Sequence, residues 1–205
     1  MDLIVLATHN QGKARELSVL LQGMASRVES LRDHAGVTLP PETGSSYAEN
    51  ALAKAREVYS TLGVPALGDD SGLEIDALGG APGLHSARYA AGGVGGETHA
   101  NAADRENIDR VLGELAGIPP ERRTARFRCV LALVRGPQDI VTAEGLCEGR
   151  ILDASRGAGG FGYDPIFVPD REIRTFAELP DEVKNVLSHR ARASAILRLA
   201  LAGDR

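Results

Sequence analysis

Two adjacent acids, Asp69 and Asp70, stand directly before Ser71 and Gly72 and are the sharpest candidates for chemistry in this chain. They follow a short apolar segment, and this order predicts a loop that turns at least one carboxylate toward a ligand. Mg²⁺ typically takes one or two protein carboxylates and completes its coordination with water and phosphate oxygens, so Glu42 is a candidate partner. An Asx-turn with two solvated acids explains the same residues equally well.

A second candidate is the run Thr8, His9, Asn10, Gln11, Gly12 and Lys13. It stands where an apolar segment passes into a helical pattern, a place where backbone N–H groups and the helix dipole favour a phosphate. Lys13 adds a full positive charge. The first glycine and the Ser/Thr of a Walker P-loop are missing, so a turn with an exposed lysine remains an alternative.

The glycine-rich segment from Gly157 to Pro165 could present a ring to a nucleobase. Its glycines let the backbone approach a ligand closely, and Phe161 stands among them. This combination predicts a site at which one base stacks.

Further donors stand on two helical patterns. Asn50 and Lys54 are four residues apart and share a helix face, which could present an amide and an ammonium to one ligand. Lys184, His189 and Arg190 could serve phosphates or base edges. A solvated helix face explains the first pair and ordinary basic decoration of a helix explains the second group, so both alternatives stay open.

The elements that must position these residues follow from periodicity, capping and turn signals. The predicted strands are residues 3–7, 65–68, 73–78, 126–135 and 140–146, the last two forming an antiparallel pair. The predicted helices are residues 13–21, 46–59, 101–115 and 180–201, the second opened by a capping box of Ser46 and Glu49. Glycine-rich loops are predicted at residues 79–96 and 157–162. One α/β domain with a mixed sheet fits this order.

Composition narrows the function classes. The net charge is -5 and aromatic residues make up 4% of the chain, with no tryptophan, so a nucleic-acid polymer is disfavoured as a ligand. The apolar run Leu3–Ala7 is too short for a signal peptide or a membrane span, which predicts a cytoplasmic protein without a membrane partner. Cys129 and Cys147 lack metal-site spacing and are interpreted as reduced structural thiols.

Read in order, six blocks of residues resemble the signature of one family, the inosine triphosphate pyrophosphatases, also called dITP/XTP pyrophosphatases. The blocks are residues 7–13, 49–55, 69–73, 80–89, 159–167 and 188–190. No single block is decisive, but their ordered combination covers nearly the whole chain and is highly specific. Ala191 and the long glycine-rich stretch 90–103 depart from the family pattern, and the second departure affects a lid or the dimer surface.

The resemblance implies a single domain over residues 1–205, with two α/β lobes around a long, mixed, curved sheet, helices packed on it and the active site in the cleft. It also implies a homodimer. The implied activity is hydrolysis of a deaminated purine nucleoside triphosphate, such as ITP, dITP or XTP, to the monophosphate and pyrophosphate.

The resemblance also assigns roles to individual residues. It implies that Glu42 and Asp70 bind Mg²⁺, that Asp70 accepts a proton, and that Thr8 to Lys13 with Lys54 hold the triphosphate. The remaining nucleotide-binding positions are Ser71, Phe161, Gly162, Tyr163, Asp164, Lys184, His189 and Arg190. Asp69 is expected to be a supporting or cation-steering acid.

Selectivity for a 6-oxo purine over adenine is expected from His189, Arg190 and the backbone N–H groups of the glycine-rich base segment. Two other functions stay open: a pyrophosphatase for modified pyrimidine nucleotides, and a nucleotide sensor that binds without turnover.

Overall fold

The computed structural model describes residues 1–92 and 100–203 and divides the chain into two compact units. Unit 1 comprises Met1–Asp70, Cys129–Gly145 and His189–Arg205, and unit 2 comprises Ser71–Arg128 and Leu146–Ser188. The cleft between two lobes that the resemblance implies stays a prediction. Of the unusual stretch 90–103, residues 93–99 lie outside the described residues.

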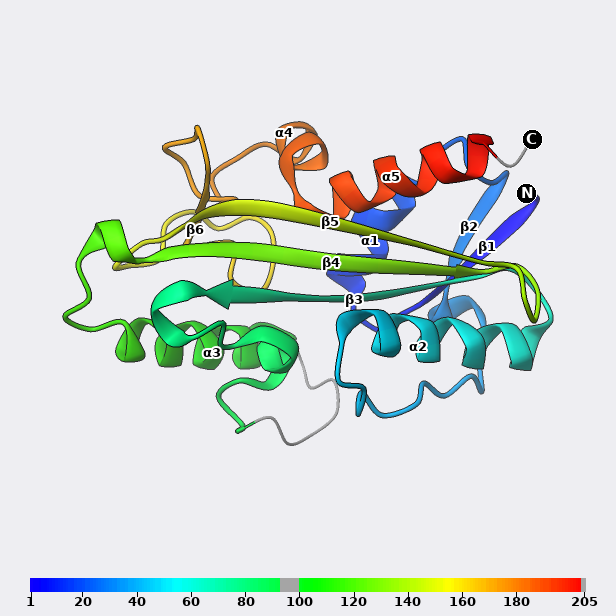
Figure 1. Cartoon of the computed structure of the whole chain (residues 1–205), viewed down its shortest axis with the longest axis horizontal. Helices are drawn as coiled ribbons and strands as arrows, with labels where there is room; N and C mark the ends of the chain where they lie inside the picture. The colour runs from blue at the N-terminus through cyan, green and yellow to red at the C-terminus, as the bar shows by residue number, and fades with distance from the viewer. Residues whose placement is uncertain (93–99, 204–205) are drawn as a thin grey trace. The chain divides into compact units, whose positions relative to one another are not determined.

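Six strands form one sheet in the order β2-β1-β3-β4-β5-β6 (Figure 1). Their bounds are β1 Leu3–Ala7, β2 Arg27–Ser30, β3 Ala66–Ile75, β4 Thr124–Val134, β5 Ile140–Ile151 and β6 Phe167–Pro169. β1 pairs in parallel with β2 and β3, whereas β6 runs antiparallel to β5. The predicted mixed sheet is therefore confirmed, and β2 and β6 are strands that the sequence pattern missed.

The predicted antiparallel pair of β4 and β5 is also confirmed. Arg135 N donates to Asp139 O at one end of the pair, and Ile151 N donates to Arg123 O at the other. Cys129 on β4 and Cys147 on β5 are both free and buried, as predicted for reduced structural thiols.

Unit 1 carries the helices α1 Gln11–Leu20, α2 Tyr47–Leu62 and α5 His189–Gly203. Half of the predicted capping box forms at the start of α2. The Ser46 hydroxyl accepts from Glu49 N, but the Glu49 carboxylate accepts from Ser45 N, one residue before the expected partner. α2 ends at Leu62 because Gly63, at φ 68°, supplies the left-handed residue that closes a helix.

Strand alternation divides the core of unit 1 between two faces of the sheet. On β1, Ile4 and Leu6 join a cluster with Leu17 of α1 and Leu197 of α5. Val5 of the same strand joins the cluster that includes Val58 of α2. The face that a strand residue occupies in unit 1 therefore decides whether it meets α2 or the pair α1 and α5.

Two glycines set how closely helices approach the strands of unit 1. A Cβ at Gly68 of β3 would lie 1.9 Å from Ala51 O of α2, and a Cβ at Gly145 of β5 would lie 2.2 Å from His189 O of α5. Both neighbours are backbone atoms, which cannot rotate away. These two positions therefore require glycine for steric reasons alone.

Gly68→Ala is accordingly expected to lower the free energy of unfolding by about 1–3 kcal/mol, the usual cost of overpacking a core. Urea denaturation measures the effect. The matched control is Gly113→Ala in a helix of unit 2, where an added Cβ meets nothing within 4 Å. That control is expected to be neutral or stabilising by up to about 1 kcal/mol. Equal destabilisation by both changes would contradict the close approach of α2 to β3.

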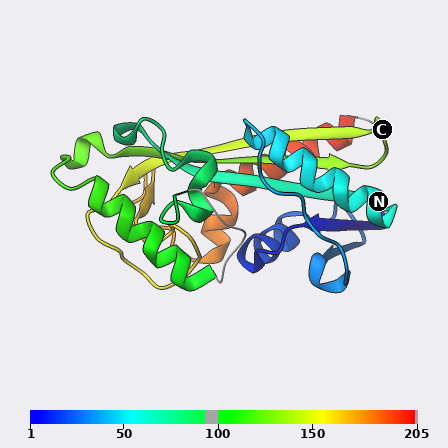
Figure 2. The ribbon, with the colours of Figure 1, turned by 90° about the horizontal axis from the view of Figure 1, so that it is seen from below.

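Unit 2 carries α3 Ala100–Glu114 and α4 Asp181–Leu187. Figure 2 shows α3 as the green helix. Ile108 and Val111 of this helix pack with Leu73 and Ile75 of β3 in one hydrophobic cluster. Phe127 adds its ring to the same cluster. The end of β3 that lies in unit 2 is thus buried beneath α3.

Two predictions about elements are wrong. Residues 69–72 form no loop, because β3 runs without interruption from Ala66 to Ile75. The predicted helix 180–201 is broken at Ser188, whose φ of -68° and ψ of 158° are extended, so that α5 begins at His189. The break gives His189 and Arg190 the first positions of a new helix.

Candidate active site

The phosphate-binding candidate begins beside the two adjacent acids. Ala7, the last residue of β1, is paired with Gly68 of the parallel strand β3. The chain leaves β1 at this point, next to Asp69. Ligands of α/β proteins bind outside the carboxyl ends of parallel strands, so the segment 8–13 lies where such a site is expected.

The segment 8–13 forms the predicted strand–loop–helix turn. Asn10 caps α1 by accepting from Lys13 N at 3.0 Å, and the Thr8 hydroxyl accepts from Asn10 N at 3.1 Å. The helix begins at Gln11, two residues earlier than predicted. The loop is therefore ordered by its own side chains, and phosphate binding by this segment stays a prediction.

Asp69 and Asp70 point to opposite faces of β3, because successive side chains of a strand alternate. Their residues are 1% and 5% exposed, respectively. The interpretation as an Asx-turn with two solvated acids is therefore wrong. Each acid meets a different set of partners within unit 1.

Asp70 faces α2 and the segment that precedes it. Asn50 Nδ2 donates to Asp70 Oδ2 at 2.9 Å, and Lys54 Nζ lies 3.6 Å from Asp70 Oδ1. The same ammonium lies 2.7 Å from Glu42 Oε1. The shared helix face of Asn50 and Lys54 is thus confirmed, but both side chains are buried, so this face is not solvated.

Burial is the largest influence on the Asp70 carboxyl and raises its pKa. Lys54 and Lys13 lower that pKa, Glu42 raises it, and the net result is a pKa above the usual value of an aspartate. A carboxylate with a raised pKa accepts a proton more readily. The Asp70 carboxyl is therefore more basic than that of an ordinary aspartate, and its role as a proton acceptor stays a prediction.

Asp69 faces α1 and α5 and is surrounded by cations. Lys13 Nζ lies 2.7 Å from Asp69 Oδ1, and Arg190 Nε donates to Asp69 Oδ2 at 2.9 Å. The Cys129 thiol donates to the same oxygen at 3.3 Å, and Arg190 also pairs with Glu16 at 2.8 Å. Asp69 thus holds two basic side chains that the sequence assigns to the nucleotide.

The electrostatics of Asp69 are the reverse of those of Asp70. Burial alone would raise the pKa of the Asp69 carboxyl, but Arg190 and Lys13 outweigh it and hold that pKa well below the usual value. The neighbouring Asp69 in turn raises the pKa of Lys13 although burial lowers it. A buried carboxylate paired with two cations holds those side chains in place, which fits the supporting role expected for Asp69. Cation steering, the other expected role, stays a prediction.

In unit 2 the predicted base segment is built around Asp164. Its carboxylate accepts from Phe161 N at 2.9 Å and forms an ion pair with the ammonium of Lys184 from α4. Lys184 Nζ lies 5.0 Å from the centroid of the Phe161 ring. The structure thus brings the ammonium of Lys184, 20 residues along the chain from Asp164, to the carboxylate and the half-buried ring of the base segment.

Three of the backbone donors expected in this segment are engaged in hydrogen bonds within unit 2. Gly159 N donates to Ala177 O at 3.1 Å, and Gly162 N donates to the Asp104 carboxylate of α3 at 2.8 Å. Phe161 N is held by Asp164. These three amides therefore cannot also read a base, and the prediction that glycine-loop amides select the 6-oxo group is wrong for them.

The other predicted residues divide between the units. Ser71 is half-buried on β3 in unit 2, and the Tyr163 side chain lies in the core of the same unit. His189 and Arg190 open α5 in unit 1, and both are 3% exposed.

Sequence reasoning missed Glu16 and Asp104, because each meets its partner only through the tertiary fold. Arg190 and Glu16 are 174 residues apart, and Gly162 and Asp104 are 58 residues apart. Neither acid stands in a local motif.

Within the described ranges 1–92 and 100–203, no cluster of three or more His, Cys, Asp and Glu side chains could hold a metal by itself. The helices of these ranges include none long and apolar enough to cross a membrane.

Comparisons with known proteins agree over nearly the whole chain. The model of the Ham1 family matches residues 4–199. A dITP/XTP pyrophosphatase of Geobacter sulfurreducens is 46% identical over 198 residues, covering 97% of this chain and 96% of that protein. A dITP/XTP pyrophosphatase of Methylococcus capsulatus is 49% identical over 197 residues, covering 95% and 93%. The structure of a HAM1 protein from Coxiella burnetii superposes with a TM-score of 0.83 at 40% identity, covering 99% of this chain and 100% of that one.

Proposed function

Because this chain belongs to the Ham1 family, we propose that it hydrolyses deaminated purine nucleoside triphosphates to the monophosphate and pyrophosphate. ITP, dITP and XTP are the substrates of this proposal; dITP and XTP stand in the names of its relatives, and ITP carries the same deaminated base as dITP. The observation that carries it is the buried cluster of Asp70, Lys54 and Glu42 beside the turn that follows β1. The activity would remove damaged nucleotides from the pool.

The donor set of this cluster fits a hard divalent cation. Glu42 and Asp70 both approach the Lys54 ammonium, so two carboxylates share one small, mostly buried space. Two carboxylates are the protein contribution typical of Mg²⁺, whose remaining positions are taken by water and phosphate oxygens. Glu42 and Asp70 would hold the ion, which when bound would neutralise and orient the triphosphate.

Asp70 would accept the proton of a water molecule that attacks the α-phosphorus. A new bond forms between the water oxygen and this phosphorus, and the bond from the phosphorus to the bridging oxygen breaks. Pyrophosphate leaves with the electron pair. Asn50 fixes the orientation of the Asp70 carboxylate through its 2.9 Å hydrogen bond.

The basic residues of unit 1 would meet the negative charge that develops on the leaving pyrophosphate. Lys54 is held beside Asp70, and Lys13 is held by Asp69. Because Asp69 fixes Lys13 in one position, less side-chain entropy is lost when the phosphate binds. Positioning and charge neutralisation supply most of the rate in this kind of chemistry.

Pyrophosphate release from a panel of triphosphates, with and without Mg²⁺, tests the proposal. We expect release from ITP, dITP and XTP only when Mg²⁺ is present. A pyrophosphatase for modified pyrimidine nucleotides would instead act best on a pyrimidine triphosphate. A nucleotide sensor would bind ITP and release nothing.

Phe161→Ala is expected to raise KM for every purine substrate and to change kcat less. The half-buried ring would stack on the base, and losing such stacking costs about 1–3 kcal/mol in single-stranded nucleic-acid sites. Steady-state kinetics with ITP and XTP measure both parameters. Phe161→Leu serves as the control because it keeps an apolar side chain without an aromatic face. If KM stays at its wild-type value for all substrates, Phe161 does not stack on the base.

We also propose that the protein is a cytoplasmic homodimer, on the strength of the family resemblance. Sedimentation equilibrium of the purified chain decides the oligomeric state.

A further inference from the structure

Ser86 lies at the junction of three hydrogen bonds inside unit 2. Its hydroxyl donates to Gly83 O at 2.6 Å and accepts from Leu73 N at 2.9 Å. Its carbonyl oxygen accepts from the Tyr163 hydroxyl at 2.8 Å. One residue of the turn Gly83–Arg88 thus contacts both β3 and the base segment.

The hydrogen bond from Leu73 N to the Ser86 hydroxyl satisfies a backbone donor on one edge of β3. Val5 N donates to Pro65 O, so the odd-numbered residues of β3 direct their backbone groups toward β1. The pairing of β1 with β3 spans Ala66 to Gly68 of β3. Farther along this edge, Leu73 N is satisfied by the Ser86 hydroxyl. A buried backbone donor needs such a partner, so Ser86 fixes the turn against the strand.

The bond to Tyr163 fixes the base segment against the same turn. Tyr163 is 5% exposed and its ring belongs to the hydrophobic core of unit 2. A buried tyrosine hydroxyl needs a partner, and here that partner is Ser86 O. Phe161 and Asp164 stand two residues before and one residue after this anchor.

We propose that Ser86 and Tyr163 are positioning residues that set the place of the base segment relative to Ser71 of β3. The proposal rests on the proposed function and on the nucleotide-binding roles that the family resemblance implies for Ser71, Phe161 and Asp164. Leu73 stands two residues after Ser71 on the same strand. The hydrogen bonds from Leu73 to Ser86 and from Tyr163 to Ser86 therefore link the strand that carries Ser71 to the base segment.

Tyr163→Phe tests the proposal because it removes one hydroxyl and keeps the ring in the core. We expect kcat/KM for ITP to fall about fivefold to tenfold, the factor that corresponds to one buried hydrogen bond, mainly through KM. The value for ATP should stay unchanged, because a base that the segment does not recognise gains nothing from its position. Amide hydrogen exchange of residues 157–165 should become faster.

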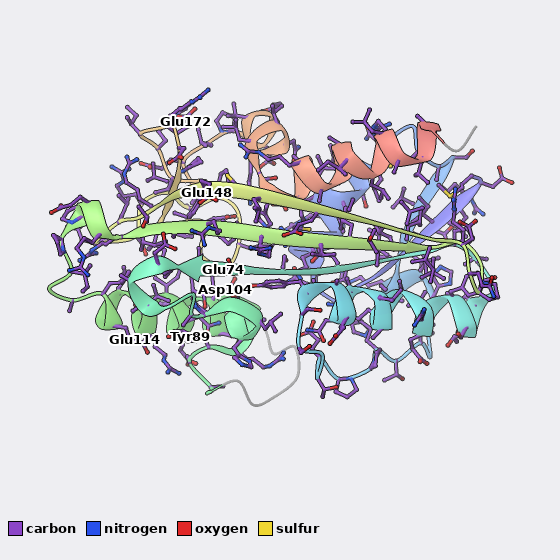
Figure 3. The ribbon with its side chains drawn as sticks, in the orientation of Figure 1. Glu74, Tyr89, Asp104, Glu114, Glu148 and Glu172 are labelled. Atoms are coloured by element: carbon purple, nitrogen blue, oxygen red, sulfur yellow. The ribbon has the colours of Figure 1, made fainter. Side chains whose placement is uncertain are left out.

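Ser86 is tested by Ser86→Ala and by Ser86→Thr. Ser86→Ala leaves Leu73 N without its acceptor and should lower kcat/KM for ITP but not for ATP, as Tyr163→Phe does. Ser86→Thr keeps a hydroxyl and should have the wild-type kcat/KM for ITP. Tyr89→Phe is the matched control. Tyr89 lies at the end of the same turn, and its hydroxyl bonds Glu114 of α3 at the surface rather than the base segment (Figure 3). This control should change neither selectivity nor exchange.

The proposal is overturned if Tyr163→Phe lowers kcat/KM for ITP and ATP by the same factor, or if exchange of residues 157–165 is unchanged. Failure of the proposed function has a different signature. In that case the wild-type protein releases no pyrophosphate from any purine triphosphate. Amide exchange of residues 157–165 still shows whether the hydrogen bond between Tyr163 and Ser86 holds the base segment in place.

Discussion

Asp70→Asn is expected to lower kcat for ITP by at least about 10²-fold, the loss typical of removing a general base. The change removes the carboxylate that would accept the proton and half of the carboxylate pair that would hold the metal. It keeps the shape of the side chain, and the new amide oxygen can still accept from Asn50 Nδ2, so the fold should survive. Pyrophosphate release by the purified, folded variant measures the effect.

Two further variants separate the roles of Asp70. Glu42→Gln removes a proposed metal ligand but no proton acceptor, so its loss of rate should be recovered at higher Mg²⁺ concentration. The loss in Asp70→Asn should persist there. Glu57→Gln on the exposed face of α2 removes the same unit of charge and should leave kcat unchanged. If Asp70→Asn keeps more than about a tenth of the wild-type kcat, Asp70 is not the base.

Selectivity for ITP over ATP in kcat/KM is expected to be the largest effect, up to about 10⁴–10⁵-fold. A 6-oxo group accepts hydrogen bonds from side-chain donors, whereas the 6-amino group of adenine cannot. Lys184 lies beside the Phe161 ring and is 4% exposed, and its ion pair with Asp164 holds the ammonium next to the place where the base would stack. A 6-oxo group would accept from this cation, whereas a 6-amino group would not pair with it. Because three amides of the glycine segment are already hydrogen-bonded, side-chain donors must select the 6-oxo group.

Comparison of kcat/KM across ITP, XTP, GTP, ATP and dUTP at saturating Mg²⁺ measures this selectivity. GTP shares the 6-oxo group and differs at its 2-amino group, so we expect ITP and XTP to exceed GTP by less than they exceed ATP. The double variant Lys184→Met, Asp164→Asn removes the ammonium donor without leaving a buried charge. It should lower kcat/KM for ITP far more than kcat/KM for ATP. ATP or dUTP as the best substrate would refute the purine proposal.

The sequence by itself determined the local features of this protein. The strand–loop–helix turn at residues 8–13, the cap at Ser46 and the hairpin of β4 and β5 each depend on residues that are close along the chain, and all three are present in the structure. Turn and capping signals act over a few residues, so the sequence contains all the information they need. The ordered blocks likewise predicted the family correctly.

Only the tertiary structure decided what Asp69 and Asp70 do. Acidic residues are rare in strands, so local propensity favoured a loop at residues 69–72. The strand is continuous because cations reach both carboxylates: Arg190 lies 121 residues from Asp69, and Lys54 comes from α2 on the opposite face. A buried carboxylate is tolerated only with such partners.

The same reason applies to the base segment. Its glycines predicted open amides, but Asp104 and Ala177 bind two of those amides from elements far along the chain. A pattern of glycines indicates where the backbone can approach a ligand, whereas the fold decides which donors remain for that ligand. Local sequence thus supplied the candidate residues, and long-range packing assigned their partners, because burial and charge pairing depend on elements that meet only in the folded chain.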